Sequence, residues 1–550
     1  MTKTSSQENE KEQTLASNTT AGSGTGDHFQ RKATGLLRGW AVRDAFIYSA
    51  FSINLITLGL FIFSFAPFIP GGSLVLAVAL AGVYLVFQAI TYASLIAVMP
   101  RAGGDYVWIS RILGGGIGFV LAVTGWWFIL WHWVPIYANI LNVQVLVPIA
   151  TILRLEGISA FFSGSTGLFV ASMVVAALAS VYISLGMRTY AKIQKVCFYG
   201  GLVGLAIMLI VLLVNSNSDF ISAYNSQAQD LYGASGNAYE QTIQAGSVEG
   251  VGAGTLGATL LLIPMIAFFN LWSNWGATLY GEVRGASDFR KNIYAMGGAL
   301  IATSAVAIVM LLLIARTIGW DFYYAASNAY WSGLEGAPSS AWPYPGLFAA
   351  FFFDSPIIQL LIVGLLSLWF FGWVGTVFLS STRVVFATAF DRVLPESVAK
   401  TTRSGVPWVA LLLMLIPSIP ISYYYAFGED FATWTLNATF VIAMTFLGSA
   451  IAAAVLPWRK PEIYNASPIA RYKILGIPLV TVSAGAFAVF LAFCFYQWIV
   501  RDAYGINAPS SFLYLGVLYV IAIALYVTFR IIRRAQGMDL KMVYDEIPED

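Results

Sequence analysis

The chain has 550 residues, of which 58% are hydrophobic and only 10% are charged, and its net charge is +2. A water-soluble domain does not need to bury so much apolar surface, so the composition excludes a soluble protein and predicts an integral membrane protein. The basic residues are dispersed along the chain, which is not the pattern of a nucleic-acid-binding surface.

Residues 1–35 differ in composition from the rest of the chain. They are rich in Ser, Thr, Asn, Glu, Lys and Gly, and they lack the apolar stretch of a signal peptide. Such a segment cannot bury enough apolar surface to offset the entropy lost on folding. We therefore expect a disordered N-terminal tail.

Twelve long apolar runs follow this tail. A helix needs about 20 apolar residues to cross about 30 Å of hydrocarbon. Windows of about that length that lack Asp, Glu, Lys and Arg occur at residues 45–67, 73–99, 117–147, 167–186, 196–214, 257–281, 293–315, 356–381, 406–425, 432–456, 478–500 and 511–529. The runs are continuous rather than alternating, which excludes a transmembrane β-barrel. The sequence therefore predicts an all-α integral membrane protein with 12 transmembrane helices.

The basic residues predict how these helices are oriented. With the N-terminus in the cytoplasm, the external loops hold only Arg154, Arg316 and Arg501 of the 29 basic residues. Cytoplasmic loops are enriched in Lys and Arg, and an even number of spans returns the chain to its starting side. We expect a multi-pass protein of the cytoplasmic membrane with both termini in the cytoplasm.

The stretch at residues 99–119 separates spans two and three. Pro100 ends one helix, and Gly103 and Gly104 permit a chain reversal that residues with a Cβ resist. Residues 105–113 then predict a short helix that turns its aromatic side chains toward lipid headgroups or toward protein. An anchored loop without further function is the alternative.

The sequence offers little material for catalysis. Its two histidines are His28 in the tail and His132 in span three, and its two cysteines, Cys197 and Cys494, fall within spans. We find no nucleophile–base–acid set, no metal-binding cluster and no phosphate-binding loop. The sequence predicts a protein that is not an enzyme, that has no cofactor or metal, and that has the lipid bilayer rather than nucleic acid as its surroundings.

Several segments together resemble the amino acid–polyamine–organocation permeases. Residues 100–127, PRAGGDYVWISRILGGGIGFVLAVTGWW, are similar to the family's P-x-x-G-G-x-Y…R-x-x-G…G-F…G-W signature. Further similar segments follow in the family's order at residues 185–196, 281–293, 380–400 and 456–464. The resemblance covers about residues 36–550.

The resemblance implies a LeuT-type architecture of two five-helix inverted repeats and two accessory helices. Its boundaries would be a first repeat at residues 36–215, an external loop at 216–256, a second repeat at 257–457, accessory spans at 458–535 and a cytoplasmic tail at 536–550.

Two stretches are the best candidates for a substrate site. Inverted-repeat transporters bind substrate where corresponding helices of the two halves are interrupted. SINLITLG at 52–59 and NLWSNWG at 270–276 combine glycine with short polar side chains that compete for backbone hydrogen bonds. Freed N–H groups attract a carboxylate, and freed carbonyls attract an ammonium. The candidate residues are Asn54, Ile56, Thr57, Leu58, Gly59, Phe268, Asn270, Leu271, Trp272, Ser273 and Asn274. Ordinary helix packing is the alternative.

This chain departs from the family's pattern at three positions. Thr57 replaces the first glycine of the span-one motif, and Trp272 occupies the glycine position of span six. The indole of Trp272 should shrink or reshape the pocket. Many proton-coupled relatives carry a lysine in span five where this chain has Gly201.

The coupling ion, Na⁺ or H⁺, stays open at this stage. Ser380 and Ser381 are candidates because their hydroxyls can join span-one carbonyls around Na⁺. His132 is a candidate because histidines inside spans often relay protons. For all three residues the alternative is helix capping or packing.

These patterns predict a secondary amino acid permease that works by alternating access without a nucleotide. The alternatives are a transporter of polyamines or organic amines, an exchanger of the same fold, or a nutrient receptor that binds without transport. A channel is not indicated, since the sequence has no charged ring or carbonyl filter. The residues do not determine which amino acid is bound or the oligomeric state.

Overall fold

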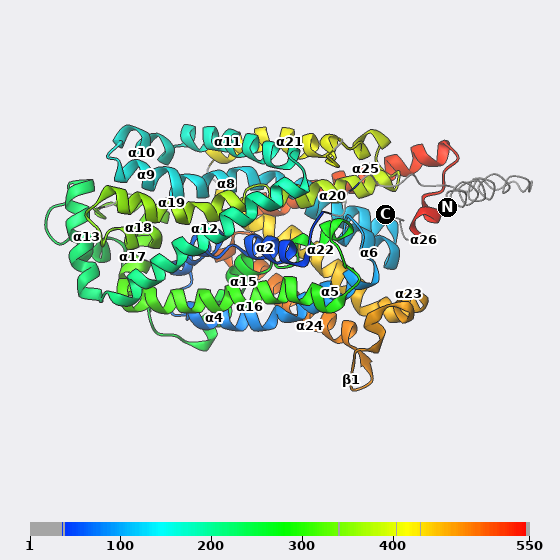
Figure 1. The fold of residues 1–550 in the computed structure, drawn as a ribbon, viewed down its shortest axis with the longest axis horizontal. Helices are drawn as coiled ribbons and strands as arrows, with labels where there is room; N and C mark the ends of the chain where they lie inside the picture. Colours follow the sequence, from blue (N-terminus) through cyan, green and yellow to red (C-terminus); the bar gives the residue numbers. More distant parts are fainter. Residues whose placement is uncertain (1–35, 37–38, 339–340, 403, 429–430, 546–550) are drawn as a thin grey trace, which may run out of the picture. The chain divides into compact units, whose positions relative to one another are not determined.

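The computed structural model describes residues 36, 39–338, 341–402, 404–428 and 431–545. The predicted tail at residues 1–35 lies outside this part of the chain. Helices dominate the described residues (Figure 1), and β1 (Lys473–Ile474) and β2 (Ile477–Pro478) form a two-stranded antiparallel hairpin.

Twelve helical segments of the described chain are long and apolar enough to cross a membrane, which confirms the predicted number. They are Val42–Phe63, Leu74–Val98, Gly115–Ile152, Ser165–Ser184, Met187–Val214, Leu256–Glu282, Phe289–Ile318, Pro356–Phe390, Trp408–Phe427, Asn437–Arg459, Leu479–Val500 and Pro509–Ala535. We call them spans one to twelve. Their long helices lie side by side in Figure 1.

Six spans contain one uninterrupted α-helix, and the other six are built from several helical pieces. The uninterrupted helices are α11 (Ser165–Ser184), α12 (Met187–Val214), α21 (Trp408–Phe427), α22 (Phe431–Arg459), α24 (Leu479–Val500) and α25 (Pro509–Ala535). Span one consists of α2 (Val42–Ile53), η1 (Leu55–Gly59) and α3 (Leu60–Phe63), span two of α4 (Leu74–Tyr84) and α5 (Val86–Val98), and span three of α7 (Gly115–Val123), η3 (Thr124–Phe128), η4 (Ile129–His132), α8 (Trp133–Leu141), η5 (Asn142–Leu146) and α9 (Val147–Ile152). Span six consists of α15 (Leu256–Asn270) and η6 (Trp275–Glu282), span seven of α16 (Phe289–Leu313) and η7 (Ile314–Ile318), and span eight of α19 (Pro356–Trp373) and α20 (Thr376–Phe390).

Short helices lie between the spans. At one end of Figure 1 are α13 (Asn217–Tyr232), α17 (Trp320–Trp331) and α18 (Pro345–Ala350), and at the other are α6 (Asp105–Ile112) and α26 (Leu540–Asp545). The remaining short elements are η2 (Ala66–Phe68), α10 (Glu156–Ser163), α14 (Ala238–Gly246), η8 (Glu396–Ala399), α23 (Pro461–Ala466), η9 (Pro468–Arg471) and η10 (Asp502–Tyr504).

The segment at residues 216–256, expected only as a loop, contains two of these helices. The side chain of Ser216 caps α13 in a reciprocal capping box with Asp219, and the side chain of Asn237 caps α14. Caps of this kind stabilise helix starts whose flanking residues are polar and rich in glycine.

The short helix predicted at 105–113 is present as α6, and it faces protein rather than lipid. Tyr106, Trp108 and Ile109 are each 0% exposed. The preceding Gly103 and Gly104 have φ angles of +96° and +39°, so the chain reversal uses the backbone freedom that the sequence predicted for them.

Two buried ion pairs connect the segments that carry the family resemblance. Arg111 forms a bidentate pair with Asp391, with an Nη2–Oδ1 distance of 2.7 Å, and the Arg383 Nε lies 2.8 Å from Glu282 Oε1. Spans six and eight continue beyond their predicted ends to include Glu282 and Arg383, because each charge is neutralised by the other. A charge ends an apolar run in the sequence without ending the helix.

We expect Glu282→Gln to destabilise the protein strongly, because the change leaves Arg383 buried without a compensating charge. Breaking a buried pair typically costs about 3–5 kcal/mol. The matched control is Arg154→Gln, which removes an exposed pair with Asp230 and should cost at most about 1 kcal/mol. The midpoint of thermal unfolding in detergent measures both effects, and equal midpoints for the two variants would contradict the expectation.

Candidate functional site

Span one is interrupted where the sequence predicted it. Helix α2 ends at Ile53, and Asn54 adopts a left-handed conformation with φ +47° and ψ +83°. Asparagine tolerates this conformation because its side chain bonds to nearby backbone. Its Oδ1 accepts a hydrogen bond from the Thr57 N–H at 3.1 Å, and its Nδ2 donates to the Trp369 carbonyl of span eight at 3.2 Å. The single turn η1 follows.

Span six is interrupted in the predicted place as well. Helix α15 ends at Asn270, residues 271–274 form turns, and the chain resumes as η6. The interruption frees the Leu271 carbonyl, which accepts a hydrogen bond of 2.8 Å from Gln88 Nε2. The Trp275 carbonyl accepts one of 3.0 Å from the Ser380 hydroxyl. Both donors come from other spans.

Two glutamines that the sequence analysis did not single out support these interruptions. Gln88 of span two bonds the Leu271 carbonyl, and Gln144 of span three donates to the Thr57 carbonyl at 2.8 Å. Both side chains are buried. The sequence could have indicated both residues, because a glutamine within an otherwise apolar span needs a hydrogen-bond partner in the protein.

The two interrupted helices touch at Gly59. A Cβ at this position would lie 2.9 Å from Cε2 of Phe269, closer than atoms normally approach. Gly59 therefore permits close packing of span one against span six. Ile56, Thr57 and Leu58 are buried in the same turn.

A small cavity of about 10 Å³ lies beside the interruptions, with room for about one water molecule. We call it the tryptophan chamber. None of the described residues that line it carries a charge; they are Ser52, Trp133, Trp272, Trp275, Trp373, Thr376 and Val377. The ring of Trp272 lies 5.8 Å from that of Trp133 and 5.1 Å from that of Trp275, each nearly perpendicular to it.

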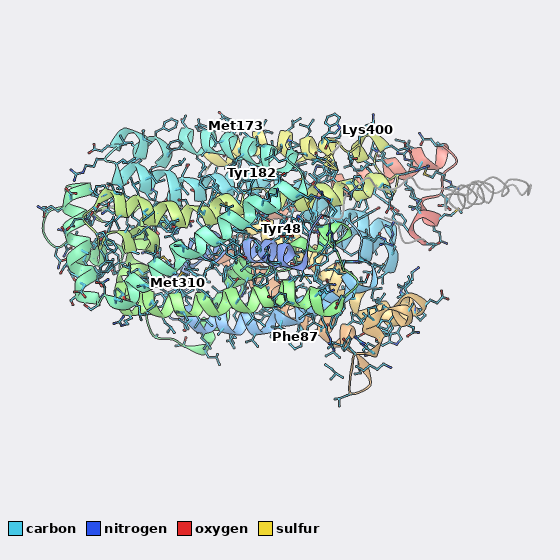
Figure 2. The ribbon with its side chains drawn as sticks, in the orientation of Figure 1. Tyr48, Phe87, Met173, Tyr182, Met310 and Lys400 are labelled. Carbon is cyan, nitrogen blue, oxygen red and sulfur yellow. The ribbon has the colours of Figure 1, made fainter. Side chains whose placement is uncertain are left out.

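A hydrogen-bonded tyrosine of span one connects to Thr376, one of the residues that line the chamber. Tyr48 on α2, fully buried at the middle of the view in Figure 2, donates to the carbonyl of Thr376 at 2.6 Å. Its hydroxyl also lies 2.7 Å from the Ser380 hydroxyl. Spans one, six and eight are thus joined beside the chamber.

Several buried polar atoms at the span-six interruption have no hydrogen-bond partner. They are both side-chain polar atoms of Asn270, the hydroxyl of Ser273, Nδ2 of Asn274 and Nε1 of Trp275, and Nε1 of Trp133 is in the same condition. An unpaired buried polar group costs about 1–3 kcal/mol. Such a concentration is typical of a place where a ligand completes the hydrogen bonding.

The predicted site residues divide into two groups. Trp272 lines the chamber, and Phe268 stacks against Trp133 at a centroid distance of 6.0 Å. Asn54 and Leu271 lie at the backbone interruptions and do not line the chamber. Trp133, Trp275 and Trp373 were not among the candidates, because tryptophans of different spans gain a common role only when the spans pack.

Ser380 and Ser381 have different surroundings. Ser380 bonds Tyr48 and the Trp275 carbonyl, whereas the Ser381 hydroxyl donates to the Val377 carbonyl of its own helix. No hydrogen bond of either hydroxyl to a span-one carbonyl occurs among the described residues. A cation site formed by both serines stays a prediction.

His132 lies away from the chamber. Its Nε2 is hydrogen-bonded to the hydroxyl of Tyr514 in span twelve, and its ring packs edge-on against Tyr425. Gly201, where many relatives carry lysine, is covered by Trp369, whose Nε1 donates to the Gly201 carbonyl at 2.9 Å. A lysine side chain at that position would collide with the indole.

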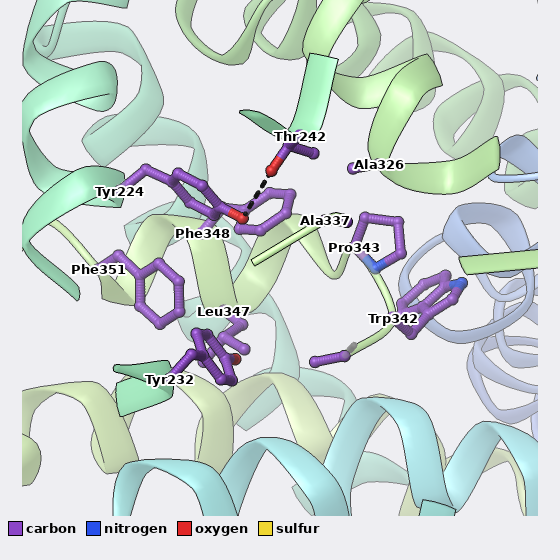
Figure 3. A pocket seen from close by; sticks show the side chains of 11 residues that line it. Tyr224, Tyr232, Thr242, Ala326, Ala337, Trp342, Pro343, Leu347, Phe348 and Phe351 are labelled. Carbon is purple, nitrogen blue, oxygen red and sulfur yellow. Dashed lines mark hydrogen bonds between the residues drawn. The ribbon is translucent and has the colours of Figure 1, made fainter. Parts of the chain in front are cut away.

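A second cavity, also about 10 Å³, lies among the loop helices rather than at the interruptions (Figure 3). Tyr224 and Thr242 face each other across it with their hydroxyls 3.3 Å apart. Nearby, the indoles of Trp331 and Trp342 both donate to the Ser64 hydroxyl, at 2.9 and 3.2 Å. Helix α17 and the segment before α18 are therefore both bonded to the end of span one.

Comparison with known proteins shows which family the chain matches. The family described as amino acid permease matches residues 45–523. The chain is also 22% identical over 473 residues to the branched-chain amino acid permease BcaP of Lactococcus lactis subsp. cremoris, an alignment that covers 84% of this chain and 87% of the relative.

We expect Gln144→Leu to destabilise the protein by about 1–3 kcal/mol, because it leaves the Thr57 carbonyl unpaired inside the protein. Gln144→Glu is not a suitable control, since it adds a charge. Gln497→Leu is suitable, because Gln497 is similarly buried in a span but its Oε1 has no partner. Thermal unfolding in detergent compares the variants. A smaller loss for Gln144→Leu than for Gln497→Leu would argue against the role of Gln144.

Proposed function

Since the chain belongs to the amino acid permease family, and is thus a membrane transporter of amino acids rather than an enzyme, we propose that its substrates are branched-chain amino acids. The observation that carries this proposal is the set of unpaired polar atoms at an interrupted helix beside an uncharged, aromatic chamber.

The interrupted helices suit the part that all amino acids share. Backbone N–H groups at a helix start favour a carboxylate, and carbonyls at a helix end favour an ammonium. Asn270 and Ser273 add unpaired donors and acceptors beside these groups. The interruptions of spans one and six support the proposal of a LeuT-type inverted repeat, in which corresponding helices are broken at the substrate site.

The chamber suits an apolar side chain. Four tryptophans and Val377 line it, and an aliphatic side chain gains free energy by leaving water for such surroundings. The named function of the Lactococcus lactis relative supports the same choice. An organic amine is the second candidate, because tryptophan faces attract cations, but no described residue of the lining supplies a carboxylate to pair with it.

Transport requires the chamber to open on each side in turn. At about 10 Å³ the chamber cannot hold an amino acid, so we propose that the structure corresponds to a closed form and that rocking of the two repeats widens it. The asymmetry of Lys and Arg supports a location in the cytoplasmic membrane with both termini inside the cell.

Uptake of radiolabelled leucine into proteoliposomes tests the proposal. We expect saturable uptake and exchange, with competition by isoleucine and valine but not by lysine, putrescine or choline. Stronger competition by the amines would favour the second candidate. Binding of leucine without flux would identify a receptor instead of a transporter.

We expect Trp272→Gly to weaken leucine binding by about 1–3 kcal/mol, the usual scale of altered packing in a specificity pocket. The larger chamber should also admit phenylalanine and tryptophan as competitors. The matched control is Trp458→Gly, at an exposed position near the end of α22. Competition curves on folded protein measure the change, and a wild-type selectivity profile for Trp272→Gly would place the side-chain pocket elsewhere.

A further inference from the structure

Four carboxylates of the described chain are buried, and Asp105 differs from the other three. Glu282 pairs with Arg383, Asp391 with Arg111, and Asp44 with Lys195 at 2.6 Å. Asp105, at the start of α6, is 0% exposed and forms no ion pair with a described residue. An unpaired charge in such surroundings is costly, and the group tends to bind a proton instead.

Neutral donors from three spans surround this carboxylate. Oδ1 accepts hydrogen bonds from the hydroxyls of Tyr92 at 2.6 Å and Ser449 at 2.5 Å, and Oδ2 accepts one from Trp126 Nε1 at 3.1 Å. Spans two, three and ten therefore each contribute one donor. These bonds are strongest when Asp105 is ionised, because bonds to a charged acceptor exceed those to a neutral one.

Two of these donors lead to the span-six interruption. The ring of Trp126 lies 4.4 Å from the ring of Trp275, which lines the tryptophan chamber. The side-chain amide of Asn274 approaches the Tyr92 hydroxyl, although its Nδ2 forms no hydrogen bond. Asn274 is held in turn by Gln88, which also bonds the freed Leu271 carbonyl. A change at Asp105 therefore reaches the interruption by contact.

The other titratable groups on the packed elements are already engaged. Tyr92 is the one that bonds the carboxylate, and Ser449 and Trp126 do not titrate in the physiological range. On α6 itself Arg111 is bound to Asp391, and Tyr106 lies against Arg111. On η6 and α20 Glu282 and Arg383 pair with each other, and Tyr544 of α26 lies against Arg111.

Burial raises the pKa of the Asp105 carboxyl to about 6, although hydrogen bonds from Ser449, Tyr92 and Trp126 counteract part of the rise. A carboxyl with this pKa is protonated in a medium more acidic than about pH 6 and ionised at a near-neutral cytoplasmic pH. The charge of Asp105 therefore changes between a mildly acidic and a near-neutral medium.

We propose that Asp105 is a proton-binding site that couples substrate movement to a proton gradient, acting on the span-six interruption through Tyr92 and Trp126. The proposal rests on the proposed function, since it assigns the coupling ion for that same chamber. It selects H⁺ over the Na⁺ site predicted at Ser380 and Ser381, and it places the proton on a residue other than His132.

The proton step changes which groups donate hydrogen bonds. A proton from water forms an O–H bond with a carboxylate oxygen of Asp105, and the same bond breaks when the proton returns to water on the other side. The ionised carboxylate accepts from all three donors, whereas the neutral acid must itself donate through its O–H. Tyr92 or another donor then loses its acceptor and is released to turn, so the contacts at Asn274 and Trp275 differ between the two states.

The test uses the full chain in liposomes that contain a trapped pH-sensitive dye, with labelled leucine as the probe. An imposed pH gradient spans about one unit on either side of the Asp105 pKa, and a Na⁺ gradient is imposed separately. For the wild-type protein we expect accumulation of leucine driven by the pH gradient alone, with acidification of the lumen that depends on leucine.

Three variants separate the coupling role from a structural one. Asp105→Asn should exchange leucine without pH dependence but lose gradient-driven accumulation by roughly tenfold or more. Ser449→Ala removes one donor to the carboxylate and should move the pH midpoint of uptake upward by up to about one unit. His132→Gln is the matched control, since it removes a titratable group that does not touch the chamber, and its pH profile should equal that of wild type.

The possible failures are distinguishable. Absence of leucine exchange by the wild-type protein would refute the proposed function itself. Exchange without proton movement, accumulation driven by Na⁺, or full gradient-driven accumulation by Asp105→Asn would overturn the role of Asp105 and leave the proposed function intact. If Asp105→Asn does not fold, as shown by size-exclusion chromatography, an unshifted midpoint for both Ser449→Ala and Asp105→Glu overturns the proposal.

Discussion

The structure depends on one constraint, which is that an interrupted helix inside a membrane must find hydrogen-bond partners within the protein. Hydrocarbon offers none, and each unpaired backbone group costs several kcal/mol. Asn54, Gln88 and Gln144 meet this demand by bonding backbone groups at or beside the interruptions of spans one and six. The polar atoms near Asn270 remain unpaired, and in the proposed function a substrate completes their hydrogen bonding.

The same constraint explains why the chamber is aromatic and closed. Tryptophan fills space with a rigid ring and still brings one N–H donor, so Trp133, Trp272, Trp275 and Trp373 exclude water from the interruption without adding charge. Trp331 of α17 and Trp342, which precedes α18, both donate to the Ser64 hydroxyl at the end of span one. In the proposed transport cycle, opening the chamber moves these rings and breaks some of these bonds, so substrate access would require motion of whole spans.

Buried charge serves two different purposes in this chain. The Arg111–Asp391 and Arg383–Glu282 pairs join distant segments. The attraction within each pair offsets the cost of burying the two charges only while both partners stay in place. Asp105 is held by neutral donors from three spans, so its charge depends on pH rather than on a fixed partner. The ion pairs give a rigid connection, whereas the Asp105 carboxyl has two possible states, ionised and protonated.

The sequence by itself determined the twelve spans and the places where spans one and six are interrupted, because both depend on local features. Apolar run length sets a span, and the glycine and short polar side chains around Asn54 and Asn270 weaken a helix wherever they occur. The tertiary structure decided the rest. Gln88, Gln144, the chamber tryptophans and Asp105 gain their roles from partners up to hundreds of residues away, and helices α13 and α14 were hidden by the polar composition around their caps. Spans eight and six were longer than the apolar runs predicted, since only packing brings Arg383 to Glu282. Local pattern carries no information about which distant side chain will meet a given group.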